Sequence, residues 1–231
     1  MTTRLLPRLR MGAAAALLLL VPLCSGCASS DEPSGPSGPT RASGAAAGSA
    51  PASSMPSTVD GLESLLLTDV PSGLPRVPDD ELDPPAGAKT IDDVARYGDD
   101  AQEQRAVLEN YGYQRGWERF WRAGNALTSV FLDQFSDPHG ASAYAADLAR
   151  NDAEYYGGVL DSAPGDLPAG CVLMAHDDPA PQHGLAGPAA FAWCSAGDFT
   201  VAVAAMAGNP AEARTELAAV TVAQLARLPA S

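Results

Sequence analysis

The chain has 231 residues, with 14 lysines and arginines against 28 aspartates and glutamates, and a formal net charge of −14. This acidity argues against a nucleic-acid partner, because no basic stripe is available to neutralise phosphates. It equally disfavours binding of a folded domain to anionic lipid. Such a charge is typical of a soluble surface outside the cytoplasm.

The first 26 residues have the features of a secretory signal peptide. Arg4, Arg8 and Arg10 precede an apolar run, GAAAALLLLVPL at 12–23, and small residues follow it. The run is too short for a membrane-spanning helix, which needs about 20 residues. We therefore expect residues 1–26 to direct secretion and to be removed.

The sequence SGC at 25–27 resembles the end of a bacterial lipobox, in which the cysteine is acylated and becomes the new N-terminus. The resemblance implies a lipid on Cys27 and attachment to the extracytoplasmic face of the cell membrane. Cys24 stands where the lipobox prefers leucine. An ordinary cleaved signal peptide is the alternative. A redox C-x-x-C pair is disfavoured, because Cys24 would leave with the signal.

Residues 27–58 predict a flexible linker. They consist almost entirely of serine, glycine, proline and alanine, so they cannot build a core. A coil of this length has a root-mean-square reach of about 30 Å. Residues 59–231 are long enough for a single globular domain. Within this domain, residues 91–111 predict a helix that breaks near Gly98 and stops at Gly112.

The sequence YGYQRGWERFW at 111–121 interleaves aromatic rings with arginines. In a regular strand, Tyr113, Trp117, Arg119 and Trp121 share one face, and they form the candidate binding surface. Aromatic rings beside arginines suit a glycan, an acidic partner or a protein interface. The alternative is that the tryptophans fill the core while the arginines lie at its edge.

A weak internal repeat relates the segment that starts at Phe120 to the segment that starts at Ala192. Each copy predicts two strands joined by a Gly-Asn or Gly-Asp turn, followed by a helix. Each helix begins with a proline, directly after a capping residue, Asp137 or Asn209. The predicted fold class is α+β, an antiparallel sheet covered by helices, with a candidate ββα repeat.

The sequence HDDPAPQH at 176–183 could supply metal ligands or hydrolytic residues, namely His176, Asp178 and His183. Its prolines predict a solvated loop instead, and the spacing matches no recognised ligand pattern. The sequence also lacks G-x-S-x-G, H-E-x-x-H, Walker and G-x-G-x-x-G motifs. We therefore expect no catalytic residue, metal or cofactor, and enzymatic activity stays open.

Two further cysteines, Cys171 and Cys194, lie in strand-like contexts, GCVLM and FAWCS. An isolated pair outside the cytoplasm usually forms a disulfide. A reactive free thiol is the alternative, although nothing basic flanks either cysteine.

The opening of the domain, GLESLLLTDVPSGLP at 61–75, resembles the start of many small secreted or lipid-anchored actinobacterial proteins. YGYQRG at 111–116 resembles their helix-to-strand junction. The resemblance implies an uncharacterised secreted α+β domain, more distantly similar to PsbP-type or extracellular sensor-type domains, and it brings no catalytic residue.

These observations together predict a lipid-anchored extracytoplasmic binding protein of the cell envelope. The membrane is a partner through the N-terminal lipid. The other expected partner is an envelope protein, a glycan or a small amphiphile. Two alternatives remain: an envelope hydrolase or metal-dependent enzyme, and an accessory or sensor lipoprotein for a membrane transporter or kinase.

Overall fold

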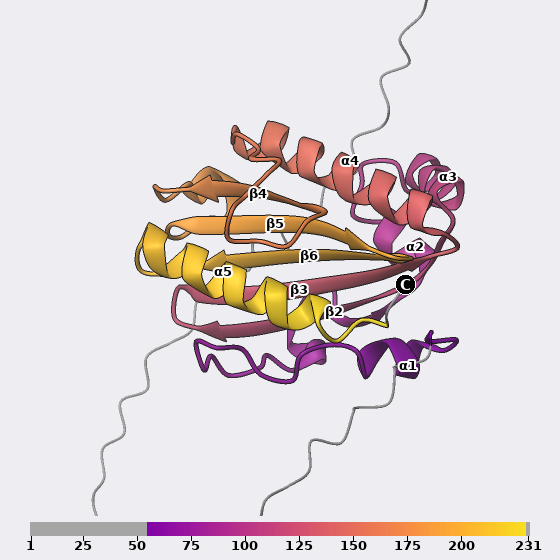
Figure 1. Cartoon of the computed structure of the whole chain (residues 1–231), viewed down its shortest axis with the longest axis horizontal. Coiled ribbons are helices and arrows are strands. Elements are labelled where there is room, and N and C mark those ends of the chain that lie inside the picture. The colour runs from indigo at the N-terminus through magenta and orange to yellow at the C-terminus, as the bar shows by residue number, and fades with distance from the viewer. Residues whose placement is uncertain (1–54, 230–231) are drawn as a thin grey trace, which may run out of the picture. The chain divides into compact units, whose positions relative to one another are not determined.

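The computed structural model describes residues 55–229, so Cys27, the predicted signal peptide and nearly all of the predicted linker lie outside the described residues. In the described part, six strands form one antiparallel sheet in the order β1-β2-β3-β6-β5-β4, and five α-helices surround it (Figure 1). This confirms the predicted α+β class. The strands are β1 (Gly87–Lys89), β2 (Tyr113–Ala123), β3 (Ala126–Phe135), β4 (Cys171–His176), β5 (Ala189–Ala196) and β6 (Phe199–Met206). The helices are α1 (Val59–Glu63), α2 (Ile91–Ala95), α3 (Ala101–Tyr111), α4 (Pro138–Tyr156) and α5 (Pro210–Leu225), with short 3-10 turns η1 (Asp79–Glu81) and η2 (Pro181–His183).

Two tight hairpins, β2–β3 and β5–β6, form the centre of the sheet. They turn at Gly124-Asn125 and at Gly197-Asp198, as the sequence predicts. The two glycines have positive φ angles of 57° and 54°, which a residue with a side chain rarely adopts. β3 pairs with β6 and thereby joins the hairpins into one sheet.

α4 and α5 each begin directly after the second strand of a hairpin. The Asp137 carboxylate accepts the backbone N–H of Gly140 at 2.9 Å, and the Asn209 side chain accepts that of Glu212 at 2.9 Å. These bonds satisfy N–H groups that the start of a helix leaves without intrahelical partners. Both predicted caps are confirmed.

The helix predicted over 91–111 is two helices, α2 and α3, and the break contains Gly98 as expected. Each helix has its own N-cap, Thr90 or Asp100. A Cβ added at Gly98 would lie 2.3 Å from Cγ of Gln104. The glycine therefore lets the chain pass close to α3 at this turn.

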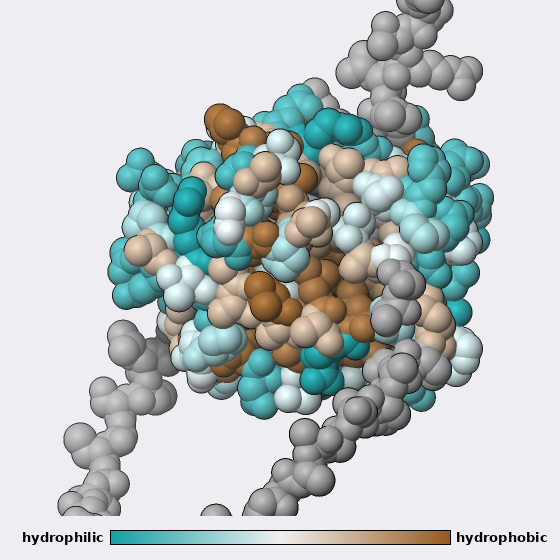
Figure 2. All heavy atoms as spheres, viewed as in Figure 1, coloured by the Kyte–Doolittle hydropathy of each residue, from teal (hydrophilic) through white to brown (hydrophobic). Residues whose placement is uncertain are grey.

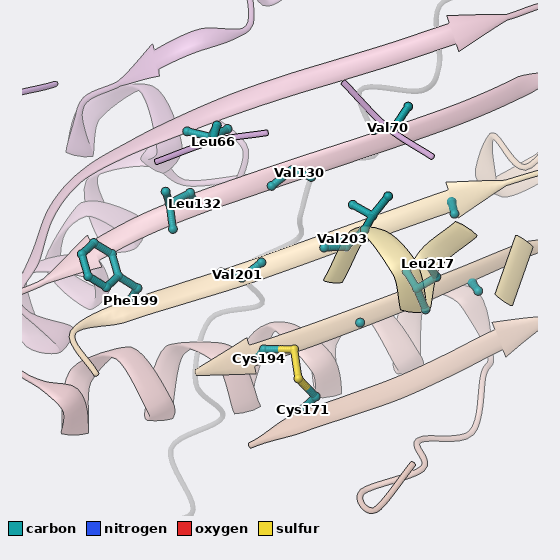
Figure 3. Packing of buried hydrophobic residues seen from close by; sticks show 14 of the residues in the cluster. Leu66, Val70, Val130, Leu132, Cys171, Cys194, Phe199, Val201, Val203 and Leu217 are labelled. Atoms are coloured by element: carbon teal, nitrogen blue, oxygen red, sulfur yellow. A yellow bond between two sulfur atoms is a disulfide. The ribbon is translucent and has the colours of Figure 1, made fainter. Parts of the chain in front are cut away.

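Strand alternation divides the core between the two faces of the sheet. Val201 and Val203 of β6 point to the face that α5 covers, where they pack with Leu217 (Figure 3). Trp193 of β5 and Leu148 of α4 belong to the cluster on the opposite face. The domain therefore has three layers, with the sheet in the middle.

The N-terminal part of the domain lies on the same face as α5. Leu66 is buried in the cluster that α5 covers. Gln224 of α5 ties this segment down: its Nε2 donates to the Leu65 carbonyl at 2.9 Å, and its Oε1 accepts from the Leu67 N–H at 3.1 Å. The residues that precede the first strand are therefore part of the core.

Cys171 and Cys194 lie directly opposite each other on β4 and β5 and form a disulfide (Figure 3). Both cysteines are buried in the cluster beneath α5. The structure thus confirms the predicted disulfide and contradicts the free-thiol alternative. The bridge joins the edge strand β4 to the centre of the sheet.

The candidate ββα repeat is not confirmed as a structural repeat. The order hairpin–helix does occur twice along the chain. However, α4 leaves its own hairpin and packs mainly against β5 and β6, whereas α5 returns onto β6 and β5 of its own hairpin. The two helices therefore cover the same strands from opposite faces, an arrangement that a simple two-fold repeat does not produce.

Candidate functional site

The predicted aromatic binding surface is not a surface. Tyr113, Trp117, Arg119 and Trp121 are exposed by only 7%, 9%, 2% and 1%. Trp117 and Trp121 belong to the core beneath the N-terminal segment and α5. The interpretation of these four side chains as an exposed patch is therefore wrong, and the core alternative describes them correctly.

The four side chains do not share one face either. The pairing of β2 with β3 shifts between Tyr113 and Arg115, because the chain is irregular at this point. Such an irregularity reverses the alternation of the residues on one side of it. Tyr113 therefore points toward α4, whereas Trp117, Arg119 and Trp121 point toward the opposite face.

Arg119 holds the N-terminal segment on the sheet. Its guanidinium donates to the Leu67 carbonyl at 2.6 Å and pairs with the Glu63 carboxylate at 2.8 Å. The indole N–H of Trp121 donates to the Thr68 carbonyl at 3.3 Å. Burial lowers the pKa of Arg119, and Glu63 partly offsets this effect. These polar groups therefore bind the protein's own backbone.

The structure does not assemble His176, Asp178 and His183 into a metal site. His176 Nε2 lies 2.7 Å from the Tyr156 carbonyl, and the His183 ring packs edge-on against Tyr155 with 4.8 Å between ring centroids. Asp178 is exposed. Among residues 55–229 there is no group of three or more histidine, cysteine or acidic side chains placed to hold a metal ion.

A buried polar cluster that the sequence analysis missed lies between the sheet and α2. It contains Lys89, Glu118 and Asp133, with Tyr97 packed against it. Lys89 Nζ pairs with Glu118 Oε2 at 3.1 Å, and the Tyr97 hydroxyl donates to Glu118 Oε1 at 2.6 Å. The sequence signal was that each of three strands carries one charged residue on its inward-facing side, where an apolar residue is expected.

The outer side of α5 carries two open depressions and is the candidate binding site. The first, which we call the α5 groove, has a volume of about 540 Å³ and lies between α5, the 71–74 segment and the adjoining ends of β3 and β6. The second has a volume of about 620 Å³ and lies farther along α5, beside Asp166. Thr215 and Ala219 line both depressions.

Small apolar residues make this side of α5 unusual for a solvent-facing helix. Val222 is 48% exposed. Apolar residues come to the surface in the middle of this face of the molecule (Figure 2). We define the α5 face by the residues of α5 and its end that line the two depressions: Ala211, Glu212, Arg214, Thr215, Glu216, Ala218, Ala219, Val222, Ala223 and Ala226.

Glu216 shapes the floor of the α5 groove. Its carboxylate accepts the Ser72 N–H at 2.9 Å and the Ser72 hydroxyl at 2.6 Å, and it also accepts the Thr128 hydroxyl at 3.2 Å. The carboxylate thus joins α5, β3 and the N-terminal segment. Glu212 is exposed at the same groove. The site is therefore an apolar groove with an acidic rim.

The α5 face could have been noticed in the sequence as a second apolar stripe. The buried stripe of this helix contains Ala213, Leu217 and Val220. Ala219, Val222 and the other small residues fall outside that stripe, where a surface helix normally carries charges. The grooves themselves could not be read from the sequence, because their walls come from distant segments.

Comparison with known proteins leaves the function open. No protein-family model matches the sequence, and no curated protein is significantly similar to it. A solved structure that resembles it is the extracellular domain of PknH from Mycobacterium tuberculosis, with 13% sequence identity and a TM-score of 0.44. The match covers 75% of this chain and 99% of that domain. A likeness at this level does not assign a function.

None of the helices in residues 55–229 has the length and hydropathy that a membrane crossing requires.

Proposed function

We propose that this chain is a lipid-anchored binding protein on the extracytoplasmic face of a bacterial cell membrane, and that the α5 face receives a protein partner. The N-terminal sequence supports secretion and a lipid on Cys27. The disulfide between Cys171 and Cys194 fits an oxidising compartment. The single observation that carries the binding role is the open apolar face around α5.

The shape of the α5 face favours a protein segment over a small amphiphile. Small-molecule sites usually bury most of the ligand's surface in an enclosed pocket. Here two shallow depressions continue along one helix and share Thr215 and Ala219. An open apolar face of this kind is typical of contacts with another chain. The glycan interpretation loses its basis, because Trp117 and Trp121 are buried.

The charge around the α5 face indicates what the partner carries. Glu212 is exposed at the α5 groove, Asp166 and Arg214 lie beside the second depression with opposite charges, and the whole chain has a net charge of −14. Complementary charges guide association and suppress wrong partners. The partner segment is therefore expected to present small or medium apolar side chains flanked by lysine or arginine.

Site-specific crosslinking of the full-length lipidated chain tests this proposal. A photoreactive residue at Thr215, on the α5 face, should give a discrete crosslinked protein in intact cells. The same residue at Ser142, an exposed position of α4, should not give that product. Ala219→Arg should abolish the Thr215 product, whereas Ala146→Arg, the same change on an exposed position of α4, should leave it intact.

Two results would contradict the proposal. One is an identical crosslinking pattern from Thr215 and Ser142, and the other is a Thr215 product that persists in Ala219→Arg. Binding of N-phenyl-1-naphthylamine, a fluorescent apolar probe, tests whether the ligand is a small amphiphile instead of a protein. If this probe binds the purified domain and Ala219→Arg abolishes its binding while no protein is crosslinked, the α5 face binds an amphiphile instead of a protein.

A further inference from the structure

Three buried charged side chains gather on the face of the sheet that lies under α2 and α3. Lys89 of β1 is opposite Gly116 of β2, and Gly116 is opposite Asp133 of β3. Glu118 lies two residues beyond Gly116 and therefore points to the same face. All three charged residues are buried, and Asp133 is only 8% exposed.

Lys89 and Glu118 satisfy each other. Lys89, the chain's only lysine, pairs with Glu118 at 3.1 Å, donates to the Pro85 carbonyl and lies 5.8 Å from the centre of the Tyr97 ring. The other Glu118 oxygen accepts the Tyr97 hydroxyl at 2.6 Å. Tyr97 lies two residues after the end of α2. This hydrogen bond therefore ties residues 91–111, the helical cap that contains α2 and α3, to the charged pair.

Asp133 belongs to the same buried cluster, but among residues 55–229 its carboxyl group forms no ion pair with a cationic side chain. A Cβ added at Gly116 would lie 2.2 Å from Asp133 Oδ1 and 2.5 Å from the Tyr113 hydroxyl oxygen. The missing side chain at Gly116 is therefore what lets the carboxyl group and the hydroxyl approach each other over the strand. The Asp133 carboxyl has a neutral hydroxyl beside it, whereas Lys89 contacts Glu118.

The charges in this site do not balance. Two carboxyl groups and one ammonium group are buried together, so one carboxyl group must hold a proton for the site to be neutral. Burial, and next the Glu118 charge, raise the pKa of Asp133 to about 7. Burial also raises the pKa of Glu118, although Lys89 opposes this shift.

Within the part of the chain that the structure describes, the groups around the site do not supply the missing positive charge. The other titratable groups that face it are Asp93 of α2, Tyr97, Tyr113 of β2 and Tyr144 of α4. Each of these is either acidic or neutral. From α3, the buried residues are an amide and a leucine, and the Arg105 guanidinium of this helix pairs with carboxylates of α2 and α3.

We propose that Asp133, Glu118 and Lys89 form a proton-binding site beneath α2 and α3, and that loss of its proton loosens this helical cap. With the proton bound, the site is neutral and the cap stays packed through Tyr97. When Asp133 ionises, its charge is poorly solvated and repels the Glu118 carboxylate. Opening of residues 91–111 brings water to the charge. This function goes beyond the binding role of the α5 face.

The direction of the pH dependence follows from linkage. In the closed cap Asp133 keeps its proton up to about pH 7. In the open cap a solvated carboxyl group loses it near pH 4. Between about pH 4 and pH 7, opening of the cap therefore releases one proton. The equilibrium constant for opening should rise about tenfold per pH unit between pH 5 and pH 7. Above the pKa of Asp133 it should become constant.

Hydrogen exchange on the full chain, corrected for the intrinsic exchange rate at each pH, measures this opening. We expect the corrected exchange of α2 and α3 amides to rise about tenfold per pH unit from pH 5 to pH 7. Asp133→Asn should reduce that increase at least tenfold over the interval. Asp152→Asn, which removes a buried carboxyl group on the same face outside this site, should leave it unchanged in α2 and α3.

Three outcomes would overturn the proposal. The first is an exchange rate in α2 and α3 that does not depend on pH once corrected. The second is a corrected exchange rate in α2 and α3 that equals that of the β5 and β6 amides at every pH, because α2 and α3 would then open only by global unfolding, in which Asp152 also releases its proton. The third comes from a carboxyl NMR titration of the wild type, which does not require a folded variant. An Asp133 pKa near the ordinary value of about 4 would exclude the site.

Discussion

Asp152 shows how a single buried carboxyl group can make stability depend on pH. It lies on the buried side of α4, and among residues 55–229 neither of its carboxyl oxygens has a partner within hydrogen-bonding geometry. Burial raises the pKa of Asp152 to about 8, and the Trp193 side chain partly opposes this shift. The folded protein therefore holds this proton at neutral pH, whereas the unfolded chain does not.

This difference predicts the sign of the pH dependence at Asp152. The stabilisation is fully present below the unfolded-state pKa of about 4 and is lost as pH rises toward about 8. The free energy of unfolding should fall by up to about 1.4 kcal/mol per pH unit from this group. Urea unfolding at pH 5, 6, 7 and 8 measures this fall. In Asp152→Asn the free energy of unfolding should decrease less steeply with pH than in the wild type.

Asp99→Asn, at an exposed position, is the matched control. Its free energy of unfolding should change with pH as that of the wild type does. An Asp152→Asn variant with the same slope as the wild type would show that Asp152 does not hold a proton in the folded state.

At the scale of elements, the edge of the sheet depends on the bridge between β4 and β5. β4 pairs with β5 along its full length, and on its other side Leu173 exchanges two backbone hydrogen bonds with Asp161, at 2.8 and 2.9 Å. The disulfide links residues 23 apart in sequence. Closing a loop of this size restricts the unfolded chain more than the folded one.

Removing this disulfide should therefore cost stability without changing the fold. Replacing both Cys171 and Cys194 with alanine should lower the free energy of unfolding by about 3 kcal/mol. Guanidinium unfolding followed by tryptophan fluorescence measures the loss. Reduction of the wild type should give a similar loss. A change below about 1 kcal/mol would mean that the loop contributes little to the entropy of the unfolded chain.

At the scale of the whole molecule, the domain joins a three-layer core to a predicted N-terminal anchor. The first strand-like contact of the domain is the bridge between Arg76 and Trp121, and Arg119 and Gln224 hold the segment before it through the carbonyls of Leu67 and Leu65. The linker predicted over 27–58 would enter the domain there. Its attachment point, Cys27, is a prediction of the sequence alone.

Lipid attachment at Cys27 can be tested directly in a host that acylates lipoproteins. The wild-type chain should incorporate a palmitate analogue and fractionate with membranes until detergent releases it. Cys27→Ser should lose both properties. Cys24→Ser is the control and should behave as the wild type, because that cysteine would be removed with the signal. Labelling that persists in Cys27→Ser would place the lipid elsewhere.

Several features of this protein could be predicted from short stretches of sequence, because their causes are local. Gly124-Asn125 and Gly197-Asp198 made the hairpins recognisable, and the caps Asp137 and Asn209 marked the starts of α4 and α5. Turn and cap chemistry depends on residues that are neighbours in the chain. The α+β class followed from the order of these elements.

Only the tertiary structure decided which side chains are exposed and which meet. The irregular pairing after Tyr113 reversed the faces of β2, and the N-terminal segment then covered Trp117 and Trp121. The meeting of Lys89 and Asp133 with β2, and the grooves beside α5, likewise join segments far apart in the chain. Burial and pairing at such places depend on distant residues, which local sequence patterns do not specify.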